Sequence, residues 1–187
     1  MIEKEEKKGN NLVFFMGIAS MILLLIGVFS EPSSLLQKIL FFVGAIGLTV
    51  VAHSNKQKML FVLQVIISLG SFLAFMEIGG IEKYILLIGS SVVCIAYLVK
   101  TKNYQKDKFG IVCTIGLTLI AAGMATDANQ SPAYFGLFLG SGGLLVALYS
   151  CMDYYLNSNK IAIIWFVLNL IFAINPLLIF ISVVMSG

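Results

Sequence analysis

Residues 14–54 read FFMGIASMILLLIGVFSEPSSLLQKILFFVGAIGLTVVAHS, which is two long apolar runs joined by a short polar turn. The stretch 110–150, GIVCTIGLTLIAAGMATDANQSPAYFGLFLGSGGLLVALYS, can be laid on it without a gap. Identical residues then pair as follows: Leu23 with Leu119, Gly27 with Gly123, Phe42 with Phe138, Gly44 with Gly140, Gly47 with Gly143, Leu48 with Leu144, Val50 with Val146, and Ser54 with Ser150. After a longer second loop, Phe61-Val62-Leu63-Gln64 falls on Phe166-Val167-Leu168-Asn169. Internal repeats around a midplane site are a common way to build transporters, so the duplication suggests transport without naming a substrate.

The composition indicates that lipid is the solvent. Hydrophobic residues make up 59% of the 187 residues and charged residues 11%, whereas a soluble domain carries about 25% charge. Backbone groups in lipid must bond internally, so each apolar run should be a helix. The seven runs are 12–29, 35–52, 59–76, 84–99, 109–125, 133–151 and 161–185. Most are slightly shorter than the roughly 20 residues that cross a bilayer, so we expect loop residues to extend them. The predicted fold class is an all-α integral membrane protein with seven transmembrane helices.

The lysines predict the orientation. All 12 basic residues are lysines, because the chain has no arginine. With a cytoplasmic N-terminus, the inner segments hold Lys4, Lys7, Lys8, Lys56, Lys58, Lys100, Lys102, Lys106, Lys108 and Lys160. The outer segments hold only Lys38 and Lys83. This bias follows the positive-inside rule, so we expect a cytoplasmic N-terminus and, after seven helices, a C-terminus outside.

The repeat and the run count predict a 3+1+3 plan within one membrane domain, 1–187. The first repeat covers about 12–79, a linking helix about 84–99, and the second repeat about 109–185. The longest polar stretch, Lys100 to Lys108, should be a hinge between the halves. The N-terminal tail mixes glutamates with lysines and lacks a convincing cleavage site, so we expect the first helix to be retained as an anchor.

Two amides are the main candidates for a functional site. Gln64 and Asn169 occupy matched positions in the third and seventh runs, and Ser68 lies one turn above Gln64. Ala173 takes the place of Ser68 in the second copy. Amides in hydrocarbon need hydrogen-bond partners. Either these residues hold helices together, or they line a cavity between the repeats.

Asn175 and Pro176 interrupt the last run. A proline inside a helix removes one backbone hydrogen bond and frees a carbonyl, and such breaks at membrane depth face protein or a cavity. Asn175 is therefore a further candidate for a cavity residue. The run is either one kinked helix or two half-helices, and the second case would return the C-terminus to the inside.

Several kinds of chemistry lose support. The acidic residues Glu31, Glu77, Asp127 and Asp153 all fall at or near predicted helix ends. The single histidine, His53, cannot build a zinc or two-histidine haem site alone. Ser141 lacks the preceding Gly of an intramembrane serine protease, because Leu139 stands there. We expect no enzymatic activity, no cofactor and no metal.

Small residues have structural explanations. The three cysteines, Cys94, Cys113 and Cys151, fall near cytoplasmic helix ends without a CxxC pair, so we expect free thiols packed as small hydrophobes. Gly136 and Gly140 form a small-xxx-small pair that allows close helix approach. That pair serves either packing within the bundle or self-association.

The apolar pattern of residues 39–104 resembles one three-helix unit of the SWEET sugar transporters and the related PnuC-type vitamin transporters. The resemblance rests on Val43-Gly44-Ala45-Ile46-Gly47, Phe61-Val62-Leu63-Gln64, Tyr84 and Ile88-Gly89. It implies two parallel three-helix units joined by a linking helix, and movement of sugars or nicotinamide riboside without an ATPase. The Pro-Gln signature of one branch and the aromatic clamp of the other are absent.

Two function classes remain open. The first is a facilitative transporter or channel for a small neutral solute, indicated by the repeat, the uncharged interior and the paired amides. The second is a non-catalytic subunit or assembly factor, indicated by short loops and Gly-rich faces. Expected partners are the lipid bilayer, a small neutral solute, and other membrane proteins or further copies of the chain. We expect no nucleic acid, and a location in the inner membrane of a prokaryotic cell.

Overall fold

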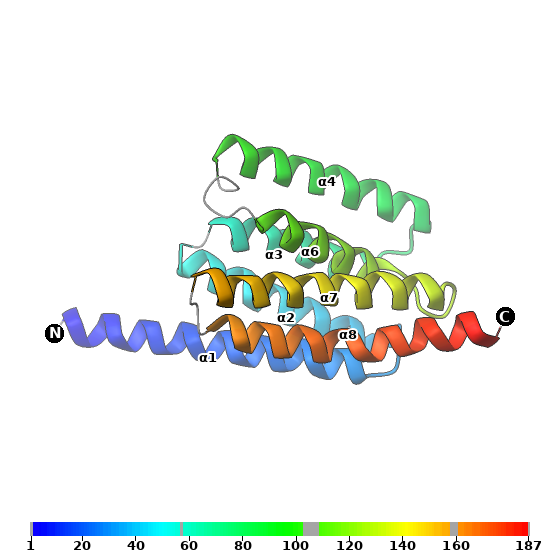
Figure 1. The fold of residues 1–187 in the computed structure, drawn as a ribbon, viewed down its shortest axis with the longest axis horizontal. Helices are drawn as coiled ribbons and strands as arrows, with labels where there is room; N and C mark the ends of the chain where they lie inside the picture. The colour runs from blue at the N-terminus through cyan, green and yellow to red at the C-terminus, as the bar shows by residue number, and fades with distance from the viewer. Residues whose placement is uncertain (1, 57, 103–108, 158–160, 187) are drawn as a thin grey trace.

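The computed structural model describes the backbone of residues 2–56, 58–102, 109–157 and 161–186. Side chains are described for 12–56, 58, 60–102, 109–156, 162–163 and 165–186. These residues form the helices α1 (Ile2–Phe29), α2 (Leu35–Ser54), α3 (Lys58–Leu73), α4 (Gly80–Lys100), α6 (Gly110–Ala125), α7 (Pro132–Asn157) and α8 (Ile161–Ser186) (Figure 1). The described part of the chain contains no strand. Residues 103–108 of the predicted hinge, and Lys160, lie outside the described residues.

Some helix ends differ from the apolar runs. The fourth helix, α4, begins at Gly80, four residues before the predicted run 84–99. Asp153, expected at or near a helix end, lies inside α7, which continues to Asn157 beyond the predicted run 133–151. Both helices extend past their apolar run, since a helix can continue into the polar interface at each membrane surface. At the start of α2, the Ser34 hydroxyl accepts from the Gln37 N–H at 3.2 Å, which is a standard N-cap.

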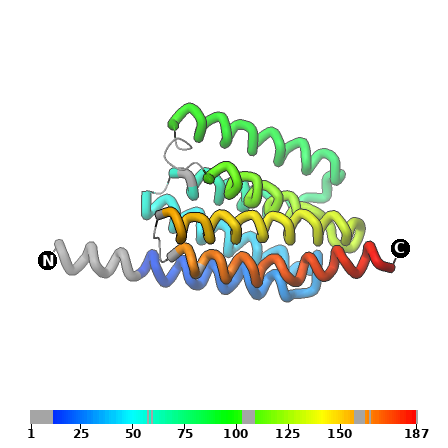
Figure 2. Tube along the Cα trace, in the orientation of Figure 1, coloured from blue at the N-terminus to red at the C-terminus, as the bar shows by residue number. Residues whose placement is uncertain are grey.

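The helices alternate in direction along the bundle (Figure 1). α1, α3, α6 and α8 run one way, and α2, α4 and α7 run back. The two termini therefore lie at opposite ends (Figure 2). We call the end with the N-terminus the near end and the end with the C-terminus the far end.

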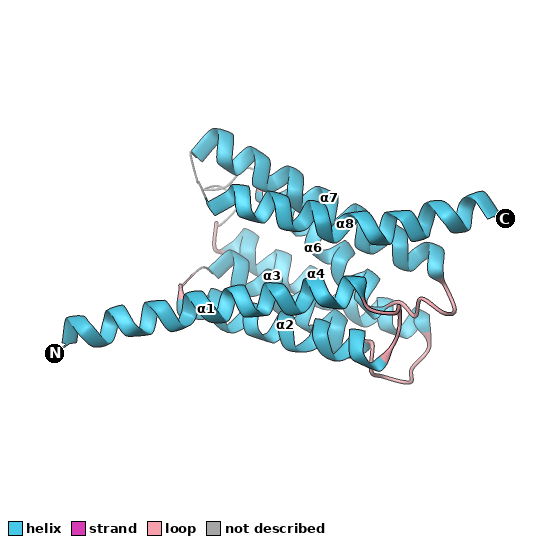
Figure 3. Ribbon diagram, turned by 90° about the horizontal axis from the view of Figure 1, so that it is seen from below, coloured by secondary structure: helices cyan, strands magenta, loops and turns pink. Residues whose placement is uncertain are grey.

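Six of the helices form a closed circuit of contacts. α1 packs on α2, α2 on α3, α3 on α6, α6 on α7, α7 on α8, and α8 returns to α1. α4 lies outside this ring and packs on α3 and α6 (Figure 1). A view from below separates α7 and α8 from α1 and α2, with α3, α4 and α6 between them (Figure 3).

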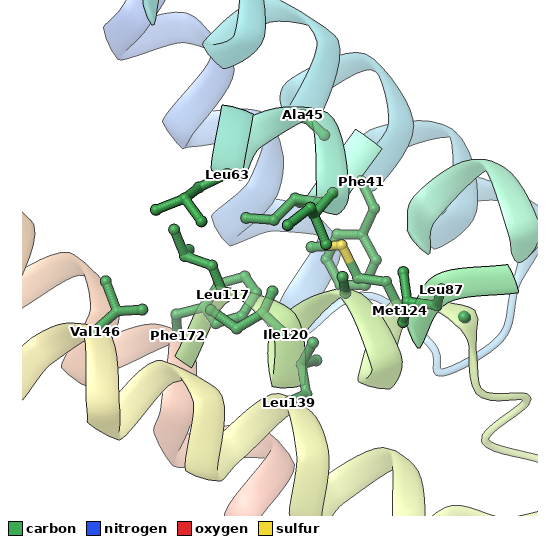
Figure 4. Close-up of a cluster of buried hydrophobic side chains, with 14 of the residues drawn as sticks. Phe41, Ala45, Leu63, Leu87, Leu117, Ile120, Met124, Leu139, Val146 and Phe172 are labelled. Carbon is green, nitrogen blue, oxygen red and sulfur yellow. The ribbon is translucent and has the colours of Figure 1, made fainter. Parts of the chain in front are cut away.

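Apolar side chains fill the interior of the ring. The rings of Phe41 from α2 and Phe172 from α8 lie with their centroids 6.2 Å apart. Leu63, Leu117 and Ile120 belong to the same buried cluster, and Figure 4 shows them converging from α3 and α6. In this conformation the bundle interior is a packed core.

Glycines bring the helices of this core together. Gly70 of α3 lies directly against the backbone of Ala121 in α6. Gly136 faces the Pro176 carbonyl of α8, and Gly140 faces Leu177 of the same helix. The small-xxx-small pair is thus covered by α8, which supports its interpretation as packing within the bundle.

Gly44 and Gly140, which the repeat matches, do not have matched neighbours, although Gly27 and Gly123 each face the next helix, α2 and α7. Gly44 of α2 faces Leu24 and the Ser20 carbonyl of α1. Its partner in the repeat, Gly140 of α7, faces α8 instead of α6. The two copies therefore use the same small residue at different helix interfaces.

The last apolar run forms one helix. α8 continues from Ile161 to Ser186 with Pro176 inside it. The two-half-helix alternative does not describe this structure, and the C-terminus stays at the far end (Figure 2). Pro176 is fully buried, so the backbone irregularity that it creates faces protein.

Five helices are long and apolar enough to cross a membrane. α3 and α6 are shorter, with 16 residues each, or about 24 Å at 1.5 Å per residue. The loops do not extend them as expected: α3 ends at Leu73, three residues before the end of its apolar run. Both short helices pack on three neighbours. The bundle also exposes large apolar side chains such as Ile81 (74%) and Val93 (69%). A surface of this kind belongs in lipid, and the chain is a helical, multi-pass membrane protein.

Candidate functional site

Gln64 is the sequence candidate that stands out in the structure. It lies on α3 and is 5% exposed. Its Oε1 atom has no hydrogen-bond partner within the described part of the chain. A buried polar atom without a partner destabilises the fold by about 1–3 kcal/mol, so a retained one is a place to look for function.

Two further buried hydroxyls share this property. Ser91 Oγ on α4 and Thr118 Oγ1 on α6 also lack a partner among the described residues. α3, α4 and α6 pack on one another in all three pairs. We call Gln64, Ser91 and Thr118 the buried polar set.

Contacts between the helices place the members of the set at similar depths. The Tyr84 hydroxyl bonds the Thr126 hydroxyl at 2.8 Å, which aligns α4 with the far end of α6. At a rise of 1.5 Å per residue, Ser91 lies about 10 Å from Tyr84 along α4, and Thr118 lies about 12 Å from Thr126 along α6. Because Gly70 abuts Ala121, the same rise places Gln64 about one turn closer to the near end than Thr118.

The chemistry of the buried polar set is neutral. An amide and two hydroxyls can donate and accept hydrogen bonds without carrying charge. Polar groups in an apolar interior are stabilised by water or by a polar solute that bonds them. The chemistry of the set therefore matches a small uncharged hydrogen-bonding molecule, and the set offers no nucleophile–base pair.

Ser68 is engaged with a neighbouring helix. Its hydroxyl lies 3.0 Å from the Thr49 hydroxyl of α2, and Thr49 also donates to the Ala45 carbonyl at 2.9 Å. This pair joins α2 to α3. Ser68 thus acts as an interhelical contact in this conformation.

The two asparagines are also engaged, each with a backbone carbonyl. Asn169 Nδ2 donates to Trp165 O on its own helix at 2.8 Å. Asn175 Nδ2 donates to Val28 O of α1 at 2.7 Å. No hydrogen bond between described residues joins Asn169 to Gln64, so the structure does not bring the matched amides together.

Asn175 belongs to a set of caps at the far end of α1. The last four carbonyls of a helix lack partners in the helix itself. Here Ser30 Oγ donates to Ile26 O at 2.8 Å and Gln37 Nε2 to Gly27 O at 3.0 Å. Asn175 supplies the bond to Val28 O. Its position before the proline therefore serves the α1–α8 contact.

A polar cluster ties the far-end loops together. Ser33 Oγ, in the α1–α2 loop, accepts from the Ala128 N–H of the α6–α7 loop at 2.6 Å. Asp127 Oδ1 accepts from the Asn129 N–H at 2.9 Å. We call Ser33, Thr126, Asp127, Ala128 and Tyr84 the far-end cluster.

The Asp127 carboxyl is held in its charged form. Burial alone would raise its pKa, but hydrogen bonds from the Asn129 N–H and the Ser33 hydroxyl favour the carboxylate. The positive charges of Lys38 and Lys83 act in the same direction. The net result is that the pKa of Asp127 lies below its ordinary value.

Sequence reasoning missed both groups, although weak signals were present. Ser91 is the second of two serines in the middle of an apolar run, and Thr118 interrupts another. The far-end loops seemed to be simple turns, because Ser33 and Ala128 are 95 residues apart. Only the fold brings such distant loops into contact.

The remaining candidates are placed as follows. His53 lies in the last turn of α2, exposed, with its ring 5.2 Å from that of Phe61. The Ser141 hydroxyl donates to Leu137 O on its own helix. Cys94, Cys113 and Cys151, which are all the cysteines of the chain, form no disulfide. Among the described residues, no group of three or more His, Cys, Asp and Glu is placed to hold a metal.

Comparisons with known proteins leave the identity open. No protein-family model, no curated protein and no solved structure matches this chain.

Proposed function

We propose that this protein lets a small, neutral, hydrogen-bonding solute cross a membrane without an ATPase partner. The observation that carries the proposal is the buried polar set: Gln64, Ser91 and Thr118 each have a polar atom inside the apolar bundle without a hydrogen-bond partner among the described residues. Polar residues inside membrane bundles commonly mark solute pathways. Because the set carries no charge, it suits an uncharged solute.

The proposal includes seven spans arranged as two parallel three-helix repeats around a linking helix. Exchanging α1, α2 and α3 for α6, α7 and α8 converts the contacts α1–α2, α2–α3 and α3–α6 into α6–α7, α7–α8 and α8–α1. All six contacts are present, and α4 lies outside the ring where a linking helix belongs. This agreement supports the repeat at the level of helix neighbours. Gly44 and Gly140 face non-equivalent helices, so this pair of glycines does not support the repeat.

One detail of the loops also favours the duplication. In the ungapped register, Ser30 falls on Thr126. Ser30 Oγ donates to the carbonyl four residues earlier at 2.8 Å, and Thr126 Oγ1 does the same at 2.7 Å. The far ends of α1 and α6 are thus closed in the same way.

We place the near end in the cytoplasm of a prokaryotic cell and the far end outside its inner membrane. Lys56 and Lys58, around the α2–α3 turn, lie at the near end with Lys100 and Lys102. Lys38 and Lys83 lie toward the far end, near the starts of α2 and α4. The distribution suits the positive-inside rule.

Uptake into proteoliposomes tests the proposed function. A panel of uncharged solutes, including sugars, polyols and amides, is offered to the purified protein and to Gln64→Leu, Ser91→Ala and Thr118→Val. We expect uptake of at least one solute class to fall about tenfold or more in these variants, a change worth about 1.4 kcal/mol. Ser182→Ala is the matched control, since Ser182 is exposed and bonds only its own helix. Equal uptake in all variants would remove the buried polar set from the pathway.

The position of α4 favours a second candidate, a non-catalytic subunit or assembly factor. This helix packs mainly on α3 and α6 and exposes Ile85, Ile88 and Val92 by 58–64%. Such a face can contact another membrane protein as well as lipid. Native purification with crosslinking through this face distinguishes the two functions, because a protein that purifies alone and stays stable in mild detergent is not an obligate subunit.

A further inference from the structure

The far-end cluster joins parts of the chain that belong to different halves. Ser33 lies in the loop after α1, and Ala128 lies in the loop after α6. Their hydrogen bond, from Ala128 N–H to Ser33 Oγ, is 2.6 Å long. In the proposed repeat these two loops correspond to each other, so the bond crosses between the halves.

Asp127 strengthens the same contact from the second loop. Its carboxylate accepts from the Asn129 N–H at 2.9 Å. Gln130 N and Ser131 N both donate to the Asp127 carbonyl, at 3.2 and 2.9 Å. The loop after α6 is therefore a compact turn built around Asp127, and the next residue, Ala128, holds the opposite loop through its N–H.

The helix α4 is attached at the same level. The hydroxyl groups of Tyr84 and Thr126 lie 2.8 Å apart. Lys83 precedes Tyr84 and, together with Lys38 of α2, places positive charge close to Asp127. Elements from the first half, the linking helix and the second half thus meet at one point.

The contact between the loops cannot be duplicated by symmetry. In the ungapped register Ala128 falls on Pro32, and Ser33 falls on Asn129. The reciprocal bond would need a backbone N–H at Pro32, which proline lacks. One bond across the halves is easier to open than two, which suits a contact that must break and re-form.

We propose that the far-end cluster is the outer gate of this protein, closed in this conformation and opened by release of Ser33 from Ala128. The inference rests on the proposed transport function. The gate consists of a few hydrogen bonds at the membrane surface above an apolar core, so its release is a first step, after which the helices beneath it must also part. A solute from outside would reach the buried polar set only after the loops separate.

Thiol labelling tests the gate without relying on transport. Ala125 ends α6 directly beneath the cluster and is 3% exposed. Ala125→Cys is introduced after Cys94, Cys113 and Cys151 are replaced by alanine, and intact cells are treated with a membrane-impermeant maleimide. We expect slow labelling, and labelling at least fivefold faster when Ser33→Ala and Asp127→Asn are added. Tyr134→Cys, at a side chain that is 59% exposed, should react rapidly in both backgrounds.

Asn129→Ala is the matched variant, because Asn129 contributes its backbone N–H to Asp127. It should leave the labelling of Ala125→Cys unchanged. Unchanged labelling in the Ser33→Ala, Asp127→Asn background, with the protein still monodisperse and folded, would overturn the gate. Fast labelling without the two substitutions would overturn it as well.

Crosslinking then separates the gate from the proposed function. Ser33→Cys with Ala128→Cys should form a disulfide within minutes of mild oxidation, lower solute uptake at least tenfold, and recover with reductant. If the disulfide forms and uptake is unaffected, the cluster is not the gate although transport stands. If labelling responds as expected but no solute on the panel is taken up by the unmodified protein, the transport proposal fails for those solutes and the gating of access remains.

Discussion

The ring of Phe41 on α2 packs against the ring of Phe172 on α8, with a centroid separation of 6.2 Å and an interplanar angle of 43°. Both side chains are more than nine-tenths buried. They meet inside the ring of helices (Figure 4), and Gly27 of α1 leaves the room that Phe41 occupies. This contact between α2 and α8 helps to fill the apolar interior of the ring of helices.

Truncation of this pair should therefore destabilise the bundle. Phe172→Ala removes a buried ring, and substitutions of this kind usually cost about 3–5 kcal/mol in protein cores. Phe172→Leu should cost less, because it keeps most of the volume. Thermal unfolding in detergent measures both variants. Equal stability of Phe172→Ala and the unmodified protein would show that the rings are not part of a packed core.

Gly70→Ala should separate α3 from α6. A Cβ atom at this position would collide with the backbone of Ala121, and a backbone cannot move aside as a flexible side chain can. We expect a loss of about 1–3 kcal/mol, as for other overpacked sites. Gly89→Ala on α4 is the matched control, since a Cβ there meets nothing within 4 Å. That variant should be unchanged or gain about 0.5–1 kcal/mol from helix propensity.

Gln64→Leu should make the protein more stable and less active. Leucine has a similar volume and removes the unpartnered Oε1 atom, whose burial opposes folding by about 1–3 kcal/mol. Functional sites commonly retain such destabilising groups. Unfolding temperature and solute uptake are measured on the same preparation. A Gln64→Leu protein that is less stable than its parent would mean that the amide holds helices together.

Asn175→Leu should weaken the contact between α1 and α8. The amide provides the hydrogen bond to Val28 O, and interhelical hydrogen bonds in membranes contribute about 0.6–1.7 kcal/mol. Asn169→Leu should have a smaller effect, because its amide bonds Trp165 O within α8. Comparison of the two unfolding midpoints checks this order. The reverse order would indicate that the α1 carbonyl finds another partner.

Acid should loosen the far-end cluster. The pKa of Asp127 is lower in the folded protein than its ordinary value of 3.8. The charged form therefore adds stability that is present above pH 3.8 and is lost as the pH falls through the lower, folded pKa. Hydrogen exchange at the Ala128 N–H should accelerate in that range relative to a core amide. In Asp127→Asn this acceleration should be absent, and its persistence would assign the pH dependence to another group.

Much of the helical plan could be predicted from the sequence, because the periodicity and length of apolar runs are local properties. The starts of α2 and α8 agree with the predicted runs, and Pro32 and the Ser34 cap explain why α2 begins where it does. Gly136 and Gly140 were correctly interpreted as positions where helices approach closely. Helix ends were less predictable, because polar residues can continue a helix beyond the membrane.

Tertiary structure alone decided which polar residues have partners. Gln64 and Asn169 are equivalent in the sequence pattern, yet Asn169 bonds its own backbone while Gln64 Oε1 has no partner among the described residues. The neighbours of an amide depend on how helices pack side by side, and a single-helix pattern does not contain that information.

The sequence by itself determined that this chain is a set of apolar helices with an unequal distribution of lysines between their ends, since composition and charge dictate which segments enter lipid. The fold determined that six helices form a ring, that α4 stays outside it, and that Ser33 meets Ala128 across 95 residues. These features arise from contacts between distant segments, whose free energy depends on shape complementarity in three dimensions.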